Sequence, residues 1–459
     1  MEKRKLRRQL KSKGASAENW KEKNKYKRLE NKALKAKIER GEKINRHHFP
    51  KRLIILSILL RIKGGCSYGG ILKVLKILQF CFQLNLVKLP CENTIQNWVT
   101  KTGLYKLKKE DKGLKGKEIS LIIDESIRMG QEKQLLVLSV PWKKEGKTAL
   151  RFEDTEVLHI QGAKSWNGEK ISEVIDKLKK EHGFILKNIL SDEDSKLKKA
   201  SRLSEVLHIP DISHAVGTCL RRSFEKEEKY KAFTKLVASY QSKGVNQDIS
   251  YLCPPKQRSK ARFMNQQGIV KWASRLLNRF EELGDKAYLF FGQLTEQQSI
   301  ISDLDNSLLL AKQISLPFKK EGLSKQSIEK ARQIIKEEKE EKGLFGIFLR
   351  QISNYLDNYQ QIVNKIGSYA IHLSSEIIES MFSKYKNKAH NNTLTGLTKL
   401  NLELPLYSMK NEDLVNLIPI ALENISMNNL EDWVEKHSSD NQLVKRNKFF
   451  KKRTLNFKF

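Results

Sequence analysis

Short apolar runs of the kind that form buried strands occur in only one part of this sequence, and this confines any sheet to a small share of the chain. The runs are residues 119–123 (ISLII), 135–140 (LLVLSV), 149–160, 185–190 (ILKNIL) and 208–212. Residues 169–182 lie between the third and fourth runs and carry the period of an amphipathic helix. This order of elements predicts an α+β fold, with a mixed sheet and helices on its faces.

Helical periodicity dominates the sequence on both sides of these strands. Three helices are expected before them, at residues 49–62, 68–82 and 90–103, with Gly103 ending the third. Glu- and Lys-rich helices are expected after them, at residues 223–243, 261–283, 324–341, 344–366 and from 374 onward. We therefore divide the chain into a basic helical arm (1–45), a compact helical domain (46–110), a sheet core in two parts (116–222 and 369–404), a helical insertion (223–368) and a basic C-terminal tail (405–459).

The charge of the chain indicates a polyanionic partner. Lys and Arg number 87 against 53 Asp and Glu, a formal net charge of +34. Nucleic acid suits such an excess, because each cation that neutralises a phosphate releases a counterion. The basic residues gather in residues 1–13 and 441–459, which are expected to follow phosphate as arms. The alternative is charge that serves solubility alone.

Several classes of protein are not expected. The longest apolar run, residues 53–60, is far shorter than the roughly 20 residues that cross a bilayer, and no apolar stretch follows the basic N-terminus as in a secretory signal. The five cysteines form no CxxC pair, so we expect neither a zinc site nor a disulfide framework. This use of cysteine is typical of a protein in a reducing cytoplasm. No phosphate-binding glycine motif is present, so no nucleotide cofactor is expected.

The third N-terminal helix has the features of a DNA-reading helix. It follows a turn, and Ile95, Trp98 and Val99 are expected to face inward. The polar residues that would then face outward and contact DNA are Asn93, Thr94, Gln96, Asn97 and Lys101. This pattern predicts a helix-turn-helix, although an ordinary three-helix packing unit fits the stretch equally well.

Three acidic residues are candidates for a metal site. Asp124 ends the first strand, Asp192 ends the fourth, and Glu379 lies on the late helix. Carboxylates at the ends of neighbouring strands face the rim of a sheet, where ligands collect. Three such oxygen donors suit two Mg²⁺ or Mn²⁺ ions about 3.5–4 Å apart, which could activate a nucleophile and stabilise the leaving oxygen of a phosphodiester.

Each acid also has a simpler interpretation. Asp192 could cap a helix at residues 193–204, and a lone acid on a helix usually faces solvent. Glu376 competes with Glu379 because residues three apart share a helix face, and Asp211 competes for the second position. Taken together, these acids on a strongly basic chain favour a metal site over the simpler interpretations.

Four stretches together resemble the DDE transposases, in particular the Mutator-like bacterial insertion-sequence transposases and their relatives. They are LIIDES around Asp124, LSDEDSKLKKA around Asp192, DISHAVGTCLRR with Asp211 and His214, and SSEIIESMFSKYKNKAHNN around Glu379. A segment with Trp272 is similar to the helical insertion of such enzymes, and the likeness covers residues 50–400. Asp211 and Glu376 depart from the usual Cys and Asn, which leaves open the third ligand and whether the copy is active.

The resemblance implies an RNase H-like core interrupted by the helical insertion and preceded by the helix-turn-helix. Asp124, Asp192 and Glu379 would hold two Mg²⁺ (or Mn²⁺) ions, and His214 would order the site, although a helix-capping role for His214 fits as well. The protein would bind the terminal inverted repeats of an insertion sequence, hydrolyse phosphodiesters and transfer strands to target double-stranded DNA. It would act as a homo-oligomer in a bacterial cytoplasm, associated with the nucleoid.

Other residues could add contacts with DNA. Lys384, Lys386 and Lys388 would share a broad helix face suited to phosphate. Trp272 could insert into a base step, but packing in a helical core is the more common use of such a residue. Two other functions fit the same features. One is a non-catalytic DNA-binding protein, including a degenerate transposase, and the other is a structure-specific nuclease that cuts DNA without joining ends.

Overall fold

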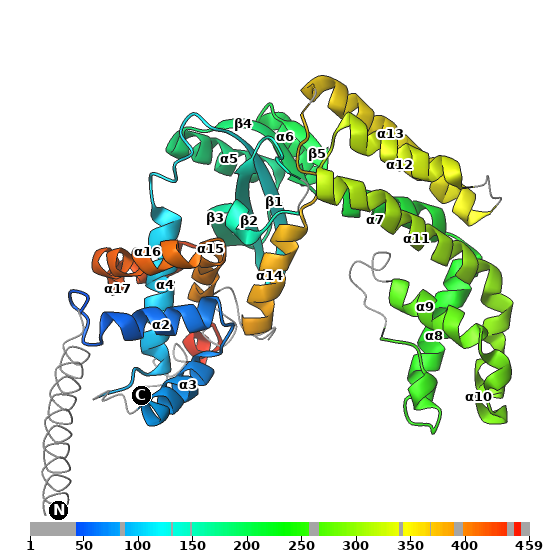
Figure 1. Cartoon of the computed structure of the whole chain (residues 1–459), viewed down its shortest axis with the longest axis horizontal. Helices are drawn as coiled ribbons and strands as arrows, with labels where there is room; N and C mark the ends of the chain where they lie inside the picture. Colours follow the sequence, from blue (N-terminus) through cyan, green and yellow to red (C-terminus); the bar gives the residue numbers. More distant parts are fainter. Residues whose placement is uncertain are drawn as a thin grey trace, which may run out of the picture. The chain divides into compact units, whose positions relative to one another are not determined.

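The protein is seen in a computed structural model (Figure 1), which describes residues 43–82, 88–129, 132–146, 149–256, 266–338, 343–367, 369–389, 398–437 and 445–450. Almost all of the expected basic arm, and the end of the basic tail, lie outside these residues. The chain divides into two compact units. One is Glu110–Lys384, and the other joins Met1–Lys109 to Tyr385–Phe459. No helix among the described residues is long and apolar enough to cross a membrane.

A five-stranded mixed sheet forms the centre of the unit Glu110–Lys384, which confirms the α+β class. Its strands are β1 (Glu118–Met129), β2 (Glu132–Pro141), β3 (Glu156–Ala163), β4 (Ile185–Ser191) and β5 (Leu207–Pro210). They lie in the order β3-β2-β1-β4-β5. Strand β2 runs antiparallel to β1 and β3, whereas β4 is parallel to both β1 and β5.

The first strand was predicted to end at Asp124 but continues to Met129, and the second begins at Glu132 instead of residue 135. Two other predicted strand boundaries were also wrong. The third strand begins at Glu156, because residues 152–154 form a 3₁₀ turn in which the backbone N–H of Arg151 donates to the side chain of Asp154 at 2.8 Å. The fifth strand ends at Pro210, because Asp211 caps the next helix instead of continuing the ladder. Both differences are local competition between a polar side chain and the strand hydrogen bonds.

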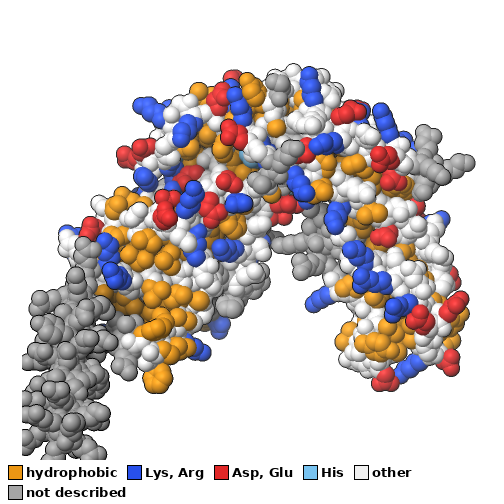
Figure 2. Space-filling model, in the orientation of Figure 1, with side chains coloured by type: hydrophobic (Ala, Val, Ile, Leu, Met, Phe, Trp, Pro, Cys, Tyr) orange, Lys and Arg blue, Asp and Glu red, His pale blue; other side chains and the backbone are white. Residues whose placement is uncertain are grey.

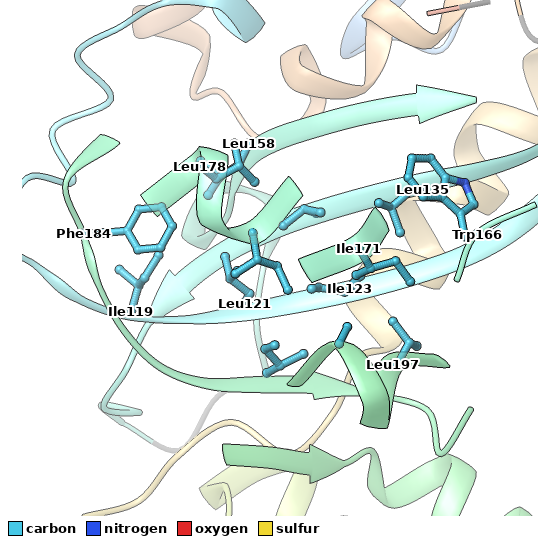
Figure 3. Close-up of a cluster of buried hydrophobic side chains, with 14 residues drawn as sticks. Ile119, Leu121, Ile123, Leu135, Leu158, Trp166, Ile171, Leu178, Phe184 and Leu197 are labelled. Carbon is cyan, nitrogen blue, oxygen red and sulfur yellow. The ribbon is translucent and has the colours of Figure 1, made fainter. Parts of the chain in front are cut away.

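The odd-numbered residues of β1 form the core of one sheet face (Figure 3). Ile119, Leu121 and Ile123 pack with Leu135 of β2 and with the apolar side of helix α5 (Gly168–His182). Leu197 of helix α6 (Ser195–Leu203) joins the same cluster. Because side chains alternate along a strand, the even-numbered residues of β1, including Asp124, belong to the opposite face.

The rest of this unit is helical, as the sequence predicted for the insertion. Its helices are α7 (Ile212–Phe224), α8 (Glu228–Gly244), α9 (Gln267–Leu277), α10 (Asp285–Phe291), α11 (Gln298–Glu321), α12 (Lys325–Glu337) and α13 (Leu344–Ile366). Helix α11, which was not among the predicted helices, packs against α7, α8, α9, α12 and α13. Trp272 packs edge-on against Tyr240 and Phe291, and its Nε1 donates to the carbonyl of Leu252 at 2.7 Å. The structure therefore favours the core role of Trp272 over insertion into DNA.

The second unit brings the C-terminal helices onto the N-terminal ones. Its elements are α2 (Lys51–Ile62), α3 (Tyr68–Cys81), α4 (Glu92–Lys108), η5 (Lys399–Glu403), α15 (Leu404–Tyr407), α16 (Asn411–Asn424) and α17 (Met427–His437). Leu104 packs with Leu402, Leu430 and Trp433 in one buried cluster. Residues 405–437 are therefore part of a folded unit, and their description as a tail was wrong.

Helix α4 continues through Gly103, which was predicted to end it. A Cβ at this position would lie 1.7 Å from the carbonyl oxygen of Leu402, so the glycine allows η5 to approach the helix backbone. The predicted helix stop is instead a packing site. This is a tertiary reason for glycine that no local pattern distinguishes from a helix end.

We expect Gly103→Ala to destabilise this unit by about 1–3 kcal/mol or more. The new Cβ would clash with the carbonyl oxygen of Leu402, which belongs to the backbone and cannot rotate away. Urea denaturation would measure the loss. Gly69→Ala is the matched control, because its Cβ would meet only the flexible side chain of Glu92 at 3.1 Å. Equal stability of the two variants would show that η5 does not pack on α4 as described.

Candidate active site

Three aspartates lie at the same level of three neighbouring parallel strands, one within β1 and one directly after each of β4 and β5. Ile122 of β1 pairs with Leu190 of β4, and Leu190 pairs with Ile209 of β5. Two residues beyond this row stand Asp124, Asp192 and Asp211. Because adjacent strands lie about 4.8 Å apart, the register places the three residues side by side at one edge of the sheet.

Asp124 and Asp192 also belong to the same face of the sheet. Two residues before the Ile122–Leu190 pair, Ser120 Oγ of β1 donates to Asn188 Oδ1 of β4, so even-numbered positions of both strands share a face. The pairing of β1 with β2 becomes irregular directly after Asp124. A β-bulge or similar irregularity changes the direction of the side chains beside it, and this one directly follows Asp124, the first candidate ligand.

Asp192 is not the cap of the next helix. Asp194 caps α6, because its side chain accepts from the backbone N–H of Lys196 at 3.0 Å. Asp192 Oδ1 accepts from the backbone N–H of Asp194 at 3.2 Å. Burial raises the pKa of Asp192, the charges of Asp194 and Glu125 raise it further, and His214 lowers it. A buried carboxylate among other acids is a position that favours a bound cation.

Asp211 accepts hydrogen bonds from two backbone N–H groups. Its side chain is 1% exposed, and its two oxygens accept from the N–H groups of His214, at 2.9 Å, and Ser375, at 2.5 Å. Burial raises the pKa of Asp211, and these hydrogen bonds oppose the rise. It thereby joins the start of α7 to the segment before α14 (Glu376–Ala389). The structure favours Asp192 over Asp211 as the second ligand.

Glu379 lies beside His214, from a distant part of the sequence. His214 Nε2 and Glu379 Oε1 are 3.1 Å apart. The hydrogen bond that His214 donates to Glu379 raises the pKa of His214 to about 9, against the effect of burial and with the help of the charges of Asp211 and Asp192. At neutral pH the imidazolium therefore lies among these carboxylates. His214 is not the cap of α7, which is Asp211, so the capping interpretation does not account for its ring.

Glu376 takes a different environment from Glu379. Its Oε1 accepts from Ser213 Oγ at 3.1 Å and forms an ion pair with Lys319. Glu379 instead contacts the ring of His214. The structure therefore favours Glu379 over Glu376 as the acid that α14 adds to the cluster.

Glu125 is an acidic neighbour that sequence reasoning missed. Its side chain is 9% exposed, forms an ion pair with Lys196, and has Oε2 3.6 Å from Lys133 Nζ. In the sequence, Glu125 is marked only by its position next to Asp124. Because side chains alternate along a strand, Glu125 is predicted to lie on the other face of the sheet from Asp124. Its charge still helps to raise the pKa of Asp192.

The chemistry of these donors suits magnesium or manganese. Asp124, Asp192 and Glu379 supply carboxylate oxygens, which both ions prefer. Within the described part of the chain, no three His, Cys, Asp or Glu side chains stand ready to hold one ion. The contact between His214 and Glu379 would have to open for Glu379 to serve as a ligand.

The residues expected to read DNA are mostly less exposed than predicted. Helix α4 runs among α2, α3, α15, α16, α17 and η5, so much of its surface is covered. Asn93 is exposed, whereas Thr94, Gln96, Asn97 and Lys101 are half-buried. Lys399 Nζ donates to Asn97 Oδ1 at 2.9 Å, and burial lowers the pKa of Lys101. Among the five predicted DNA-reading residues, only Asn93, in the first turn of α4, is fully exposed.

The structure describes the side chains of two of the three predicted phosphate-binding lysines of α14. Lys384 Nζ lies 5.3 Å from the ring centroid of Phe152, and its side chain is half-buried. Lys386 is also half-buried, while the side chain of Lys388 lies outside the described residues. The broad lysine face expected of this helix is therefore narrower than the sequence suggested.

A pocket of about 160 Å³ adjoins the first turn of α14. Its polar lining includes Lys144, Lys319, His372, Ser374 and Glu376. His372 is 9% exposed, and burial together with the charge of Lys144 lowers its pKa to about 4. The ring is thus neutral at pH 7 and positive only in acid.

We expect His372 to make this unit less stable in acid. Its folded pKa of about 4 lies below the unfolded value of 6.5, so its contribution is fully present above pH 6.5 and is lost as the pH falls toward 4. The loss should reach about 3 kcal/mol at pH 4. Urea denaturation of wild type and His372→Gln from pH 4 to 7 would measure it, since the variant should lack this part of the slope. His48→Gln, at an exposed histidine, should keep the wild-type slope.

Comparison with known proteins adds no relative to this description. No protein-family model matches the sequence, and no curated protein matches it. The arrangement of Asp124, Asp192, His214 and Glu379 is therefore the basis on which a function is proposed.

Proposed function

We propose that this protein is a metal-dependent DNA transposase of the DDE type. The observation that carries the proposal is the register of Asp124 and Asp192, which follow one β-pair by two residues on neighbouring parallel strands. Glu379 extends the cluster, because it contacts His214 and the charge of His214 acts on Asp192. These contacts support a cluster that takes one acid from each of the three segments that the resemblance names.

The fold supports the same proposal. Three antiparallel neighbours followed by two parallel strands, in the order β3-β2-β1-β4-β5, are consistent with an RNase H-like core. Helices α8 to α13 separate the strands from α14, as expected of a core interrupted by an insertion. We infer that the insertion shapes a surface for DNA and that α14 brings Glu379 back to the sheet.

Asp124, Asp192 and Glu379 would hold the metal ions. When bound, such ions activate a water or a 3′-hydroxyl and stabilise the leaving oxygen of a phosphodiester. The residues of the chain position these carboxylates through the strand register and through the Asp211 contacts that fix α7 to the start of α14. His214 would hold positive charge beside Glu379 until the site is assembled on DNA.

The proposal is tested by three assays on one preparation of the full chain. Duplexes copied from the DNA that flanks the gene would be examined for binding, for Mg²⁺-dependent nicking and for joining of the 3′ end to a second duplex. We expect all three activities. Cutting without joining would instead indicate a nuclease, and binding without cutting would indicate a DNA-binding protein or a degenerate copy.

Helix α9 offers a surface that fits the DNA backbone. Lys271 and Arg275 are exposed and lie four residues apart, so they share one side of the helix, and the exposed Arg279 follows two residues after its end. Figure 2 shows Lys and Arg side chains gathered over this part of the unit. Cations spaced along a helix in this way suit successive phosphates.

We expect duplex binding to weaken steeply with salt, and the triple variant Lys271→Gln, Arg275→Gln, Arg279→Gln to reduce the slope of log K against log salt. Each lost phosphate contact removes about 0.9 from the slope, so the reduction should approach about 3. Fluorescence anisotropy from 50 to 300 mM salt would measure it, with the duplex concentrations fixed.

The control for this surface is a triple variant of α5, with Lys170, Lys177 and Lys180 each replaced by Gln. These lysines are also exposed, but α5 covers the sheet face opposite to Asp124. The control should keep the wild-type slope. An equal reduction in both triple variants would mean that net charge, not the α9 surface, governs binding.

A further inference from the structure

Helix α13 of the insertion carries two buried tyrosines. Tyr355 is 6% exposed and Tyr359 is 0% exposed, and they lie four residues apart on the buried face of the helix. Phe345 and Phe348 occupy the same face, so packing there does not require a hydroxyl group. A buried tyrosine hydroxyl usually has a hydrogen-bond partner, and for both residues this partner lies beside an aspartate of the candidate site.

The hydroxyl of Tyr355 acts on the turn that carries Asp192. It donates a hydrogen bond to Oε2 of Glu193, the residue directly after Asp192. Glu193 Oε1 accepts from Lys198 Nζ of α6 at 2.8 Å, so this side chain is held from two helices. The peptide bond between Asp192 and Glu193 is planar, and fixing one of these residues therefore restricts the direction of the other.

The hydroxyl of Tyr359 acts on the neighbouring strand end. It donates to the carbonyl of Pro210, the last residue of β5, at 3.0 Å. The next residue, Asp211, donates its N–H to the carbonyl of Ser191 at 2.9 Å, and Ser191 ends β4 directly before Asp192. One helix of the insertion therefore supports the ends of both strands that precede these aspartates.

Stability alone is the simpler explanation of these contacts, but the tyrosine rings already provide it. The ring centroids of Tyr355 and Tyr359 lie 6.3 Å apart, and that of Tyr359 lies 5.9 Å from the ring of Phe318 in α11. Phenylalanine at both positions would keep this packing. A hydrogen bond adds direction, because it weakens steeply away from its preferred geometry. Two such bonds from successive turns of one helix fix the strand ends beside Asp192 and Asp211.

We propose that α13 positions Asp192 for the reaction, with Tyr355 acting through Glu193 and Tyr359 acting through the end of β5. This inference rests on the proposed function and deepens it, since it gives the insertion a second task beside the binding of DNA. In this role neither tyrosine contacts the reacting atoms, so both are positioning residues. Displacing a reacting group by about 1 Å can lower a rate about 100-fold, which makes the loss of such support measurable.

The first test measures amide hydrogen exchange of the full chain by mass spectrometry, without metal or DNA. Tyr355→Phe should speed exchange at residues 192–194 at least about tenfold, because the turn loses its hydrogen bond to α13, while residues 119–123 exchange as in wild type. Tyr240→Phe is the matched control, because it alters another buried tyrosine of the insertion, which packs on Trp272. It should leave both segments unchanged. No change at residues 192–194 in Tyr355→Phe, or an equal increase at residues 119–123, would overturn the proposal.

The second test measures the steady-state kinetics of nicking. Tyr355→Phe should lower kcat about 10- to 100-fold and leave KM for the duplex within about twofold of wild type. Glu193→Gln keeps an oxygen that can accept from Tyr355, so it should retain more activity than Glu193→Ala. The double variant Tyr355→Phe with Glu193→Ala should be no slower than the slower single variant, because both changes remove one interaction.

Two outcomes of the kinetic test would overturn the proposal, namely a wild-type kcat in Tyr355→Phe or losses that multiply in the double variant. Absence of nicking by wild type would instead refute the proposed function. The exchange test needs no catalysis, so it would still decide whether α13 holds the turn that carries Asp192.

Discussion

Asp192→Asn is expected to lower Mg²⁺-dependent nicking of end duplexes by at least about 1000-fold, or about 4 kcal/mol in the barrier. The amide keeps the shape of the side chain and its hydrogen bond with Asp194, but it removes the negative charge that would hold the metal. Single-turnover nicking under saturating duplex would measure the effect. Duplex binding should change little, because the residue would act on metal and not on phosphate.

Asp194→Asn is the matched control for this experiment. Asp194 lies two residues away and caps α6, and Asn caps a helix as well as Asp does. The control should retain nicking. Because burial raises the pKa of Asp192, its charge costs the fold energy, and Asp192→Asn should unfold at the same temperature as wild type or higher. Nicking by Asp192→Asn at the wild-type rate would remove Asp192 from the mechanism.

Glu403→Gln is expected to destabilise the other unit by about 3–5 kcal/mol, because it leaves a buried arginine without its counter-charge. Arg61 is 3% exposed, and its Nε donates to Glu403 Oε1 at 2.8 Å. Tyr68 donates to the same oxygen at 2.8 Å, and Tyr407 donates to Oε2 at 3.0 Å. Denaturant unfolding followed by tryptophan fluorescence would report the change, because Trp98 and Trp433 are buried in this unit.

Two variants separate the ion pair from a general effect of charge. Glu435→Gln makes the same chemical change at an exposed site on α17 and should leave stability within about 0.5 kcal/mol of wild type. Replacing both partners, Arg61→Met with Glu403→Leu, should recover part of the loss, since no buried charge is then left alone. A small effect of Glu403→Gln alone would contradict the burial of this pair.

Local patterns in the sequence were enough to locate most elements of the sheet core. Apolar runs identified all five strands, and the period of residues 169–182 identified α5 nearly to its ends. The same runs indicated correctly that Asp192 follows a strand, but not that β1 continues past Asp124 to Met129. Errors arose where a side chain competes with the backbone, as at Asp154 and Asp211, because such competition depends on a few hydrogen bonds and not on periodicity.

Contacts between distant parts of the chain could not be predicted in this way. Gly103 resembled a helix stop, yet it accommodates Leu402, and residues after 405 resembled a tail, yet they complete the unit of α4. These outcomes depend on which apolar faces match in shape. A single sequence states that a face is apolar but not which other face covers it.

The sequence by itself determined the α+β class and the approximate positions of the strands, because the side-chain period is a local property. Only the tertiary structure decided that β1 and β4 are neighbours in one register, that His214 lies beside Glu379, and that Lys144 and His372 line one pocket. These are meetings of residues separated by long stretches of chain. They are set by the packing of whole elements, in which every face must find a partner of matching shape and charge.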